Sequence, residues 1–243
     1  MKYIKFFVLM ACASTLTFTS CVNSNKKELE EQHQQWIESL NDSISLYQSK
    51  LDSIQNELTT VNNKIGTLLY DFAHISNPRE VAGYYILDGW QNKYPLKQTG
   101  IVARINEDEK IEVIAALQKG SFTHVSLEAD GKEYTSRPVP HDQAFNYKTD
   151  GLNTVCFTGG SADSLAMFIA NHDADKIKMT FIENTATGNF TIPENEKNMI
   201  TQTWTLYSTK REAVNLEKLI SLFNGRIAAC RKIILSNDTV NNK

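Results

Sequence analysis

Hydrophobic residues between positions 37 and 75 recur at alternating spacings of three and four, with polar residues between them. The apolar positions are Ile37, Leu40, Ile44, Tyr47, Leu51, Ile54, Leu58, Val61, Ile65, Leu68, Phe72 and Ile75. This is the a/d pattern of a heptad repeat, and a helix with so narrow an apolar stripe must pack against another helix. We therefore expect a coiled-coil helix over residues 31–76, about 70 Å long at 1.5 Å per residue. Pro78 ends it, because the residue before a proline is driven out of the helical region.

A second heptad stripe lies near the end of the chain, and it predicts a helix over residues 209–236. Its apolar positions are Leu216, Ile220, Phe223, Ile227, Cys230 and Ile234. The two stripes are natural partners, so we expect the two helices to form an antiparallel hairpin. The second helix should be only about 40 Å long and should cover residues 51–75 of the first. Residues 37–47 would then lack a partner, which predicts a homo-oligomer through this segment. A frayed helix and a different envelope protein are the alternatives.

The hydrophobic period changes from helical to two in the middle of the chain, which predicts a β-rich domain over residues 79–208. Asp130-Gly131 between two alternating segments is a strong hairpin signal. The expected strands are 81–87, 100–106, 110–117, 122–129, 132–137, 153–158, 165–170, 176–183 and 200–207. No helical crossover is expected between them, so the sheet should be antiparallel. The fold class is α+β, with an antiparallel β-sandwich or a partly open barrel inserted between the two helices.

Overall charge narrows the classes of partner. The chain has 243 residues and a formal net charge of -3. A mildly acidic chain offers no electrostatic basis for binding nucleic acid. The length allows one globular domain with additional elements.

The first residues are typical of a signal peptide that directs a protein to the cell envelope. Lys2 and Lys5 precede an apolar run, and the segment ends in Thr19-Ser20-Cys21 before polar residues. Small residues just before a cysteine resemble the lipobox of bacterial lipoproteins, which implies cleavage after residue 20 and lipid on Cys21. Residues 1–20 would then be a signal peptide and 21–30 a tether, with the membrane as a partner through Cys21. An ordinary cleaved signal peptide or an uncleaved anchor is the alternative.

A short pattern, Asp followed by Ser or Thr and an aliphatic residue, occurs four times. It places Ser43, Ser53, Ser164 and Thr239 in the middle position. The pattern resembles the O-glycosylation sequon of Bacteroidota envelope proteins, and the resemblance implies O-glycans at these four residues. Residues 237–243, which include Thr239, are expected to be a polar tail. Together with the lipobox, the pattern gives a generic resemblance to Bacteroidota envelope lipoproteins with a coiled coil and a β-rich domain. That resemblance implies an outer-membrane location, on either the periplasmic or the surface face.

No arrangement of residues typical of catalysis or of a resident metal or cofactor stands out. Cys156 and Cys230 are expected to be buried thiols, with a disulfide as the alternative in an oxidising compartment. The sequence His172-Asp173-Ala174-Asp175 is interpreted as a polar turn rather than a metal site. We predict no catalytic residues, no metal and no cofactor.

Aromatic residues in two irregular stretches are the candidate binding residues. Trp90 and Tyr94 lie in residues 88–99, and Phe145 and Tyr147 lie in residues 138–152. They could form a platform for a sugar or a protein, or they could cap the ends of the core. The leading hypothesis is a non-enzymatic, lipid-anchored envelope protein whose coiled-coil stalk presents a β-domain to a protein or glycan.

Two rival functions remain open from the sequence. One is an envelope hydrolase acting on carbohydrate or peptidoglycan, which would use His124, His141 and Asp142 if the fold gathers them in one cleft. The other is an assembly factor in which the coiled coil itself is the working surface.

Overall fold

The computed structural model describes residues 24–76 and 83–241. The described residues divide into two compact units, 24–49 with 223–241, and 50–76 with 83–222. Cys21 and the rest of the expected signal peptide and tether up to residue 23 lie outside the described residues. Among the described residues, no helix combines the length and the apolar composition that a membrane span requires.

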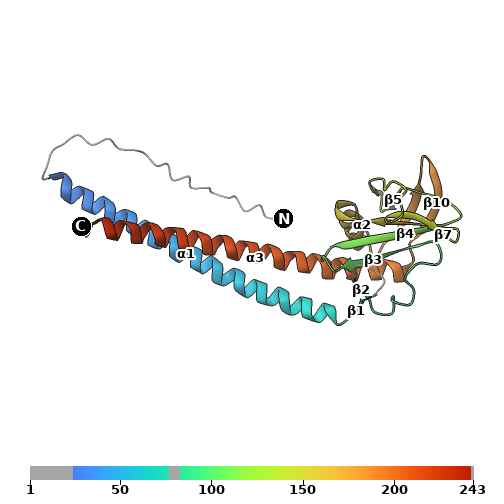
Figure 1. Cartoon of the computed structure of the whole chain (residues 1–243), viewed down its shortest axis with the longest axis horizontal. Helices are drawn as coiled ribbons and strands as arrows, with labels where there is room; N and C mark the ends of the chain where they lie inside the picture. Colours follow the sequence, from blue (N-terminus) through green and yellow to red (C-terminus); the bar gives the residue numbers. More distant parts are fainter. Residues whose placement is uncertain (1–23, 77–82, 242–243) are drawn as a thin grey trace. The chain divides into compact units, whose positions relative to one another are not determined.

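The α+β architecture is confirmed. In chain order the elements are α1 (Ser24–Leu69), β1 (Phe72–Ile75), β2 (Tyr84–Leu87), β3 (Gly100–Asn106), β4 (Ile111–Gln118), β5 (His124–Ala129), β6 (Lys132–Thr135), β7 (Asn146–Thr149), β8 (Leu152–Phe157), α2 (Gly159–Asn171), β9 (Lys178–Ile182), β10 (Ala186–Thr191) and α3 (Glu194–Asn241). Figure 1 shows this order along the colour ramp, with the strands between the two long helices in the sequence.

The strands form two open antiparallel sheets. One has the order β1-β2-β3-β4-β8-β7, and the other has the order β10-β9-β5-β6, so neither sheet closes into a barrel among the described residues. The predicted Asp130-Gly131 hairpin is confirmed, and both of its residues have positive φ, as a two-residue turn of this kind requires. Asp150 and Gly151 form a second such turn, between β7 and β8.

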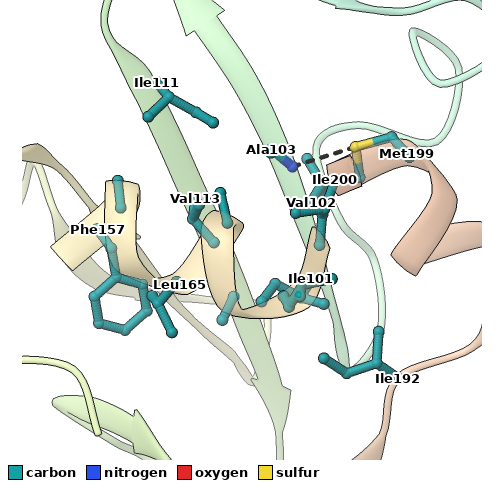
Figure 2. Close-up of a cluster of buried hydrophobic side chains, with 14 of the residues drawn as sticks. Ile101, Val102, Ala103, Ile111, Val113, Phe157, Leu165, Ile192, Met199 and Ile200 are labelled. Atoms are coloured by element: carbon teal, nitrogen blue, oxygen red, sulfur yellow. Dashed lines mark hydrogen bonds between the residues drawn. The ribbon is translucent and has the colours of Figure 1, made fainter. Parts of the chain in front are cut away.

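One hydrophobic core joins the inner faces of both sheets. Val113 and Phe157 of the six-stranded sheet, Phe181 of β9 and Leu165 of α2 are all fully buried in it. Figure 2 shows Leu165 beside Phe157, with Val113 and Ile101 on the adjoining strands. The four-stranded sheet alternates buried and more exposed side chains along β9, because only one of its faces meets the core.

Two of the expected strands are helical. Residues 165–170 belong to α2, where the buried positions Ala162, Leu165, Ala166 and Ile169 follow helical spacing. Residues 200–207 belong to α3, and their run of alternating threonines resembles a strand only in sequence. The hydroxyl groups of Thr203, Thr205 and Thr209 each donate to the carbonyl four residues earlier, so these side chains are accommodated inside a helix. The expectation of no helix between the strands is therefore wrong, although the sheets remain antiparallel.

The two long helices are nearly equal in length, so the predicted length mismatch is wrong. α1 has 46 residues and α3 has 48, about 70 Å each at 1.5 Å per residue. The expected helix 209–236 begins instead at Glu194. The expected polar tail, residues 237–243, is helical as far as Asn241.

The helices pack antiparallel in both units, as predicted, but in a different register. In one unit Val61 packs with Ala213 and Leu216; in the other the Tyr47 ring lies 5.8 Å from the Phe223 ring, between centroids. Phe72 and Ile75, assigned to the heptad stripe from sequence, form β1 and pack against the β-domain core. Ile37, Leu40, Ile44 and Tyr47 are partly buried, so the reason for assigning them an external partner does not hold. Self-association through residues 37–47 stays a prediction.

Candidate ligand pocket at the start of the C-terminal helix

The first turns of α3 cover the part of the β3 edge that pairs with no strand among the described residues. β2 pairs with β3 only at the far end, through Tyr84 with Asn106 and Tyr85 with Ile105. Along the remainder, the Ile101 N–H donates to Glu196 Oε2 at 2.9 Å, and the Ala103 N–H donates to Met199 Sδ at 3.3 Å. Figure 2 shows this second bond, with Met199 at the edge of the strand. Side chains of α3 thus satisfy backbone groups that a neighbouring strand would otherwise bind.

Glu196 is the unusual member of this contact, because it is a carboxyl group with only 7% of its surface exposed. Burial raises the pKa of Glu196 to about 7, although the hydrogen bond from Ile101 favours the charged form. Gly100 leaves the space that the carboxyl needs: a Cβ there would lie 3.0 Å from Glu196 Oε1. The group can therefore accept or donate a hydrogen bond near neutral pH.

A pocket of about 330 Å³ opens beside Glu196, between the 88–99 loop and the start of α3. Its lining combines one indole, one leucine, two lysines, three side-chain amides and a single carboxyl group. These residues are Trp90, Asn92, Lys93, Leu96, Lys97, Gln98, Asn195 and Glu196. Lys93 Nζ lies 4.7 Å from the centre of the Trp90 ring, which holds its positive charge at the pocket.

Arg104 on β3 holds the 88–99 loop against the outer face of the six-stranded sheet. Its guanidinium lies 4.5 Å from the Tyr84 ring and 5.2 Å from the Tyr94 ring, and its Nε donates to Glu112 Oε2 at 2.6 Å. Asn106 donates to the other oxygen of Glu112. Burial raises the pKa of Tyr94, so this phenol stays protonated at neutral pH. Arg104 and Tyr94 thereby position the loop that carries Trp90 and Lys93.

The four aromatic residues predicted to bind a ligand fall into two groups. Trp90 is 6% exposed and Tyr94 is partly buried, and both pack against the core as well as standing in the loop beside the pocket. Phe145 and Tyr147 are 44% and 37% exposed, just before and within β7. Only Trp90 of the four lines the pocket. A binding role for Tyr94, Phe145 and Tyr147 stays a prediction.

The residues considered for a hydrolase have other partners. His141 Nδ1 lies 3.1 Å from Asn146 Oδ1 and its Nε2 lies 2.9 Å from Glu183 Oε1, two oxygens that accept hydrogen bonds, whereas His124 pairs with the neighbouring Thr123 hydroxyl. Asp142 accepts backbone N–H groups from the turn that follows it, and these bonds lower its pKa. No hydrogen bond or ion pair joins His124, His141 and Asp142 to one another in the part of the chain that is described.

The polar segment after α2 is a turn, as expected. His172 ends the helix through its N–H bond to the Ile169 carbonyl, and Lys197 Nζ donates to the carbonyls of Asp173 and Asp175. Within the described ranges, no three His, Cys, Asp or Glu side chains gather closely enough to hold a metal ion. Lys197 therefore ties this turn to α3 through backbone carbonyl groups.

The cysteines at positions 156 and 230 are free thiols. Burial raises the pKa of Cys156 to about 12, helped by the nearby charge of Glu112, so this thiol is unreactive at neutral pH.

The predicted glycan acceptors lie on helices. Ser53 is exposed on α1, Ser43 is partly buried there, and Thr239 lies near the end of α3. Ser164 lies in α2; its neighbour Leu165 is fully buried, and Asp163 pairs with Arg211 at 2.7 Å. Modification at all four residues stays a prediction.

Glu196 and the polar lining of the pocket were missed by sequence reasoning. The signal that could have located Glu196 is the run Pro193-Glu194-Asn195-Glu196, in which a proline and two acidic residues mark the first turn of a helix. No protein-family model, curated protein or solved structure matches this chain.

Proposed function

We propose that this chain is a lipid-anchored cell-envelope binding protein, in which a pair of long helices carries a β-domain that binds a glycan. The proposal combines the lipobox-like N-terminus with the pocket beside Glu196. Several amides, lysines and a carboxyl group around one concave site are the groups that recognise hydroxylated ligands, through directional hydrogen bonds beside the largely buried Trp90 indole. Between the protein and glycan partners considered from sequence, a small polar pocket favours the glycan.

The composition of the pocket favours binding over hydrolysis. A buried glutamate with a raised pKa is typical of a general acid. Taken alone, this feature favours the hydrolase alternative. Glycoside hydrolases, however, usually work with two carboxyl groups on either side of the scissile bond. Glu196 is the one carboxyl group among the residues that line this pocket. We therefore assign Glu196 a role in recognition.

The lysines at the rim define which glycans should bind best. Lys93 and Lys97 bring two positive charges, and Glu196 is largely neutral below pH 7. An oligosaccharide that carries a carboxylate or phosphate substituent suits this arrangement, because the anion pairs with a lysine while hydroxyl groups meet the amides.

Ligand binding gives the direct test. We expect the purified protein to bind acidic oligosaccharides from a glycan array, and Lys93→Ala and Asn92→Ala to weaken binding about tenfold, the effect of removing one charged or polar contact. Lys132→Ala, an exposed lysine on β6, is the matched control and should bind as the native protein does. Equal binding by all three variants would rule out this pocket, and release of shortened glycans would favour the hydrolase.

Membrane attachment is tested separately. We expect the native protein to fractionate with membranes, since two or more acyl chains hold a protein stably on a bilayer. Cys21→Ala should release the protein to the soluble fraction or leave it unprocessed. Normal processing and membrane fractionation of this variant would remove the anchor from the proposal, whatever the result for the pocket.

A further inference from the structure

β10 forms one outer edge of the four-stranded sheet, and part of its backbone points away from the sheet. The Ile192 N–H donates to the Ile177 carbonyl, so the backbone groups of Ile192 point toward β9. Along an antiparallel pair, every second residue of β10 turns its backbone groups toward β9 and the residues between turn theirs outward. Asn189 opposite Thr180, and Thr191 opposite Lys178, are consequently the positions whose backbone groups face outward. Among the described residues, no other segment forms a backbone hydrogen bond with Asn189 or Thr191.

This edge lacks the charged side chains that the outer strands β6 and β7 carry. The outer strand β6 carries Lys132 and Glu133, and the outer strand β7 carries Lys148. No ionisable residue occurs from Thr185 to Pro193. Natural sheets usually block an exposed edge with charged side chains, so an uncharged edge is a template for another strand.

A bulge and a proline limit where a strand can add. The pairing with β9 shifts register between Ala186 and Gly188, and Pro193 follows the strand without an N–H to donate. The regular part of the edge is therefore centred on Phe190, with one outward-facing residue on each side of it.

We propose that β10 of a second copy of this chain adds antiparallel to this edge and forms a symmetric dimer. With Phe190 facing Phe190 of the partner subunit, Asn189 lies opposite the partner's Thr191, and Thr191 lies opposite the partner's Asn189. Each of these pairs exchanges two backbone hydrogen bonds. In a two-fold arrangement the strand pairs with itself, and a charged strand would bring like charges close together; this strand has none.

A proline substitution tests the role of the outward backbone group. Asn189→Pro removes an N–H that the β9 pairing does not use, whereas Asn189→Ala keeps it. Both variants lose the bond from the Thr180 hydroxyl to the Asn189 side chain. They therefore differ in whether residue 189 keeps its outward-facing backbone N–H. In sedimentation equilibrium we expect the native protein and Asn189→Ala to dimerise, and Asn189→Pro to dimerise about tenfold less tightly or not at all. Equal thermal melting of the two variants shows that both are folded.

Cross-linking tests the register. In a Cys230→Ser background, we expect a short bis-maleimide to join an Asn189→Cys copy to a Thr191→Cys copy when the two are mixed. A native protein that stays monomeric, or a dimer that Asn189→Pro leaves intact, would overturn the proposal. A dimer that Ile37→Asp and Ile44→Asp abolish while Asn189→Pro does not would place self-association in the helical pair instead.

Discussion

Replacing Arg104 by methionine should lower the free energy of unfolding by about 3 kcal/mol, because it leaves Glu112 as a buried charge without its partner. The Arg104 and Glu112 side chains are 20% and 12% exposed, so water replaces the lost contact poorly. Asn106 still donates one hydrogen bond to Glu112, which keeps the effect from growing larger. The guanidinium also lies over the Tyr84 and Tyr94 rings, and these contacts are lost with it. Urea denaturation at neutral pH measures the change.

Two controls separate burial from charge in this experiment. The pair Lys178 and Glu128 lies 3.8 Å apart with both side chains more than half exposed, so Lys178→Met should lower stability by less than about 1 kcal/mol. The double variant Arg104→Met with Glu112→Leu should recover much of the stability, since no charge is then left buried. If Arg104→Met matched Lys178→Met, the Arg104–Glu112 pair would contribute no more to stability than an exposed ion pair does.

The protein should become less stable as the pH rises from about 4.5 to 7, and Glu196→Gln should remove most of that change. Burial raises the pKa of Glu196 from 4.5 to about 7 in the folded chain. The folded state therefore prefers the neutral carboxyl group. The stability that this preference contributes is complete below the pKa of Glu196 in the unfolded chain. It is lost as the pH rises through the pKa of Glu196 in the folded chain. The expected loss is about 2 kcal/mol above pH 7, allowing for partial contact with solvent.

Glutamine is the informative replacement, because its carbonyl can still accept from the Ile101 N–H while the group never ionises. At pH 8 the variant should be more stable than the native protein, and at pH 4 the two should be alike. Glu128→Gln, at an exposed position, should follow the native pH profile throughout. Parallel profiles for the native protein and Glu196→Gln would show that this carboxyl does not titrate in the predicted window.

The sequence predicted correctly the elements whose local hydrophobic pattern matches the burial of their side chains in the fold. The stripe from Ile37 to Leu68 has a helical period, and α1 buries it along one side. Asp130-Gly131 supplies the positive φ values of a tight hairpin, and the bounds of β3, 100–106, agree with the predicted strand. Asp150-Gly151 carried the same turn signal, and it could have located β7.

Tertiary contacts decided the elements in which local pattern and burial disagree. Thr201, Thr203 and Thr205 have the preference of strand residues, yet Met199, Ile200, Leu206 and Tyr207 bury the face of a helix in the core. The same contacts extend α3 back to Glu194, which makes the two long helices nearly equal in length. Leu68 and Phe72 likewise pack on the β-domain core, so the register of the helical pair differs from the one that counting heptads predicts.

The sequence by itself determined the α+β class, the presence of two helices with heptad stripes and the lipobox-like pattern at the N-terminus, because each of these is a pattern of residues close together in the chain. Only the tertiary structure decided the pocket. Glu196 and Gly100 are 96 positions apart, and nothing in either segment alone indicates that a carboxyl group covers the edge of β3. Burial gives Glu196 its unusual pKa, and burial is a property of the whole fold.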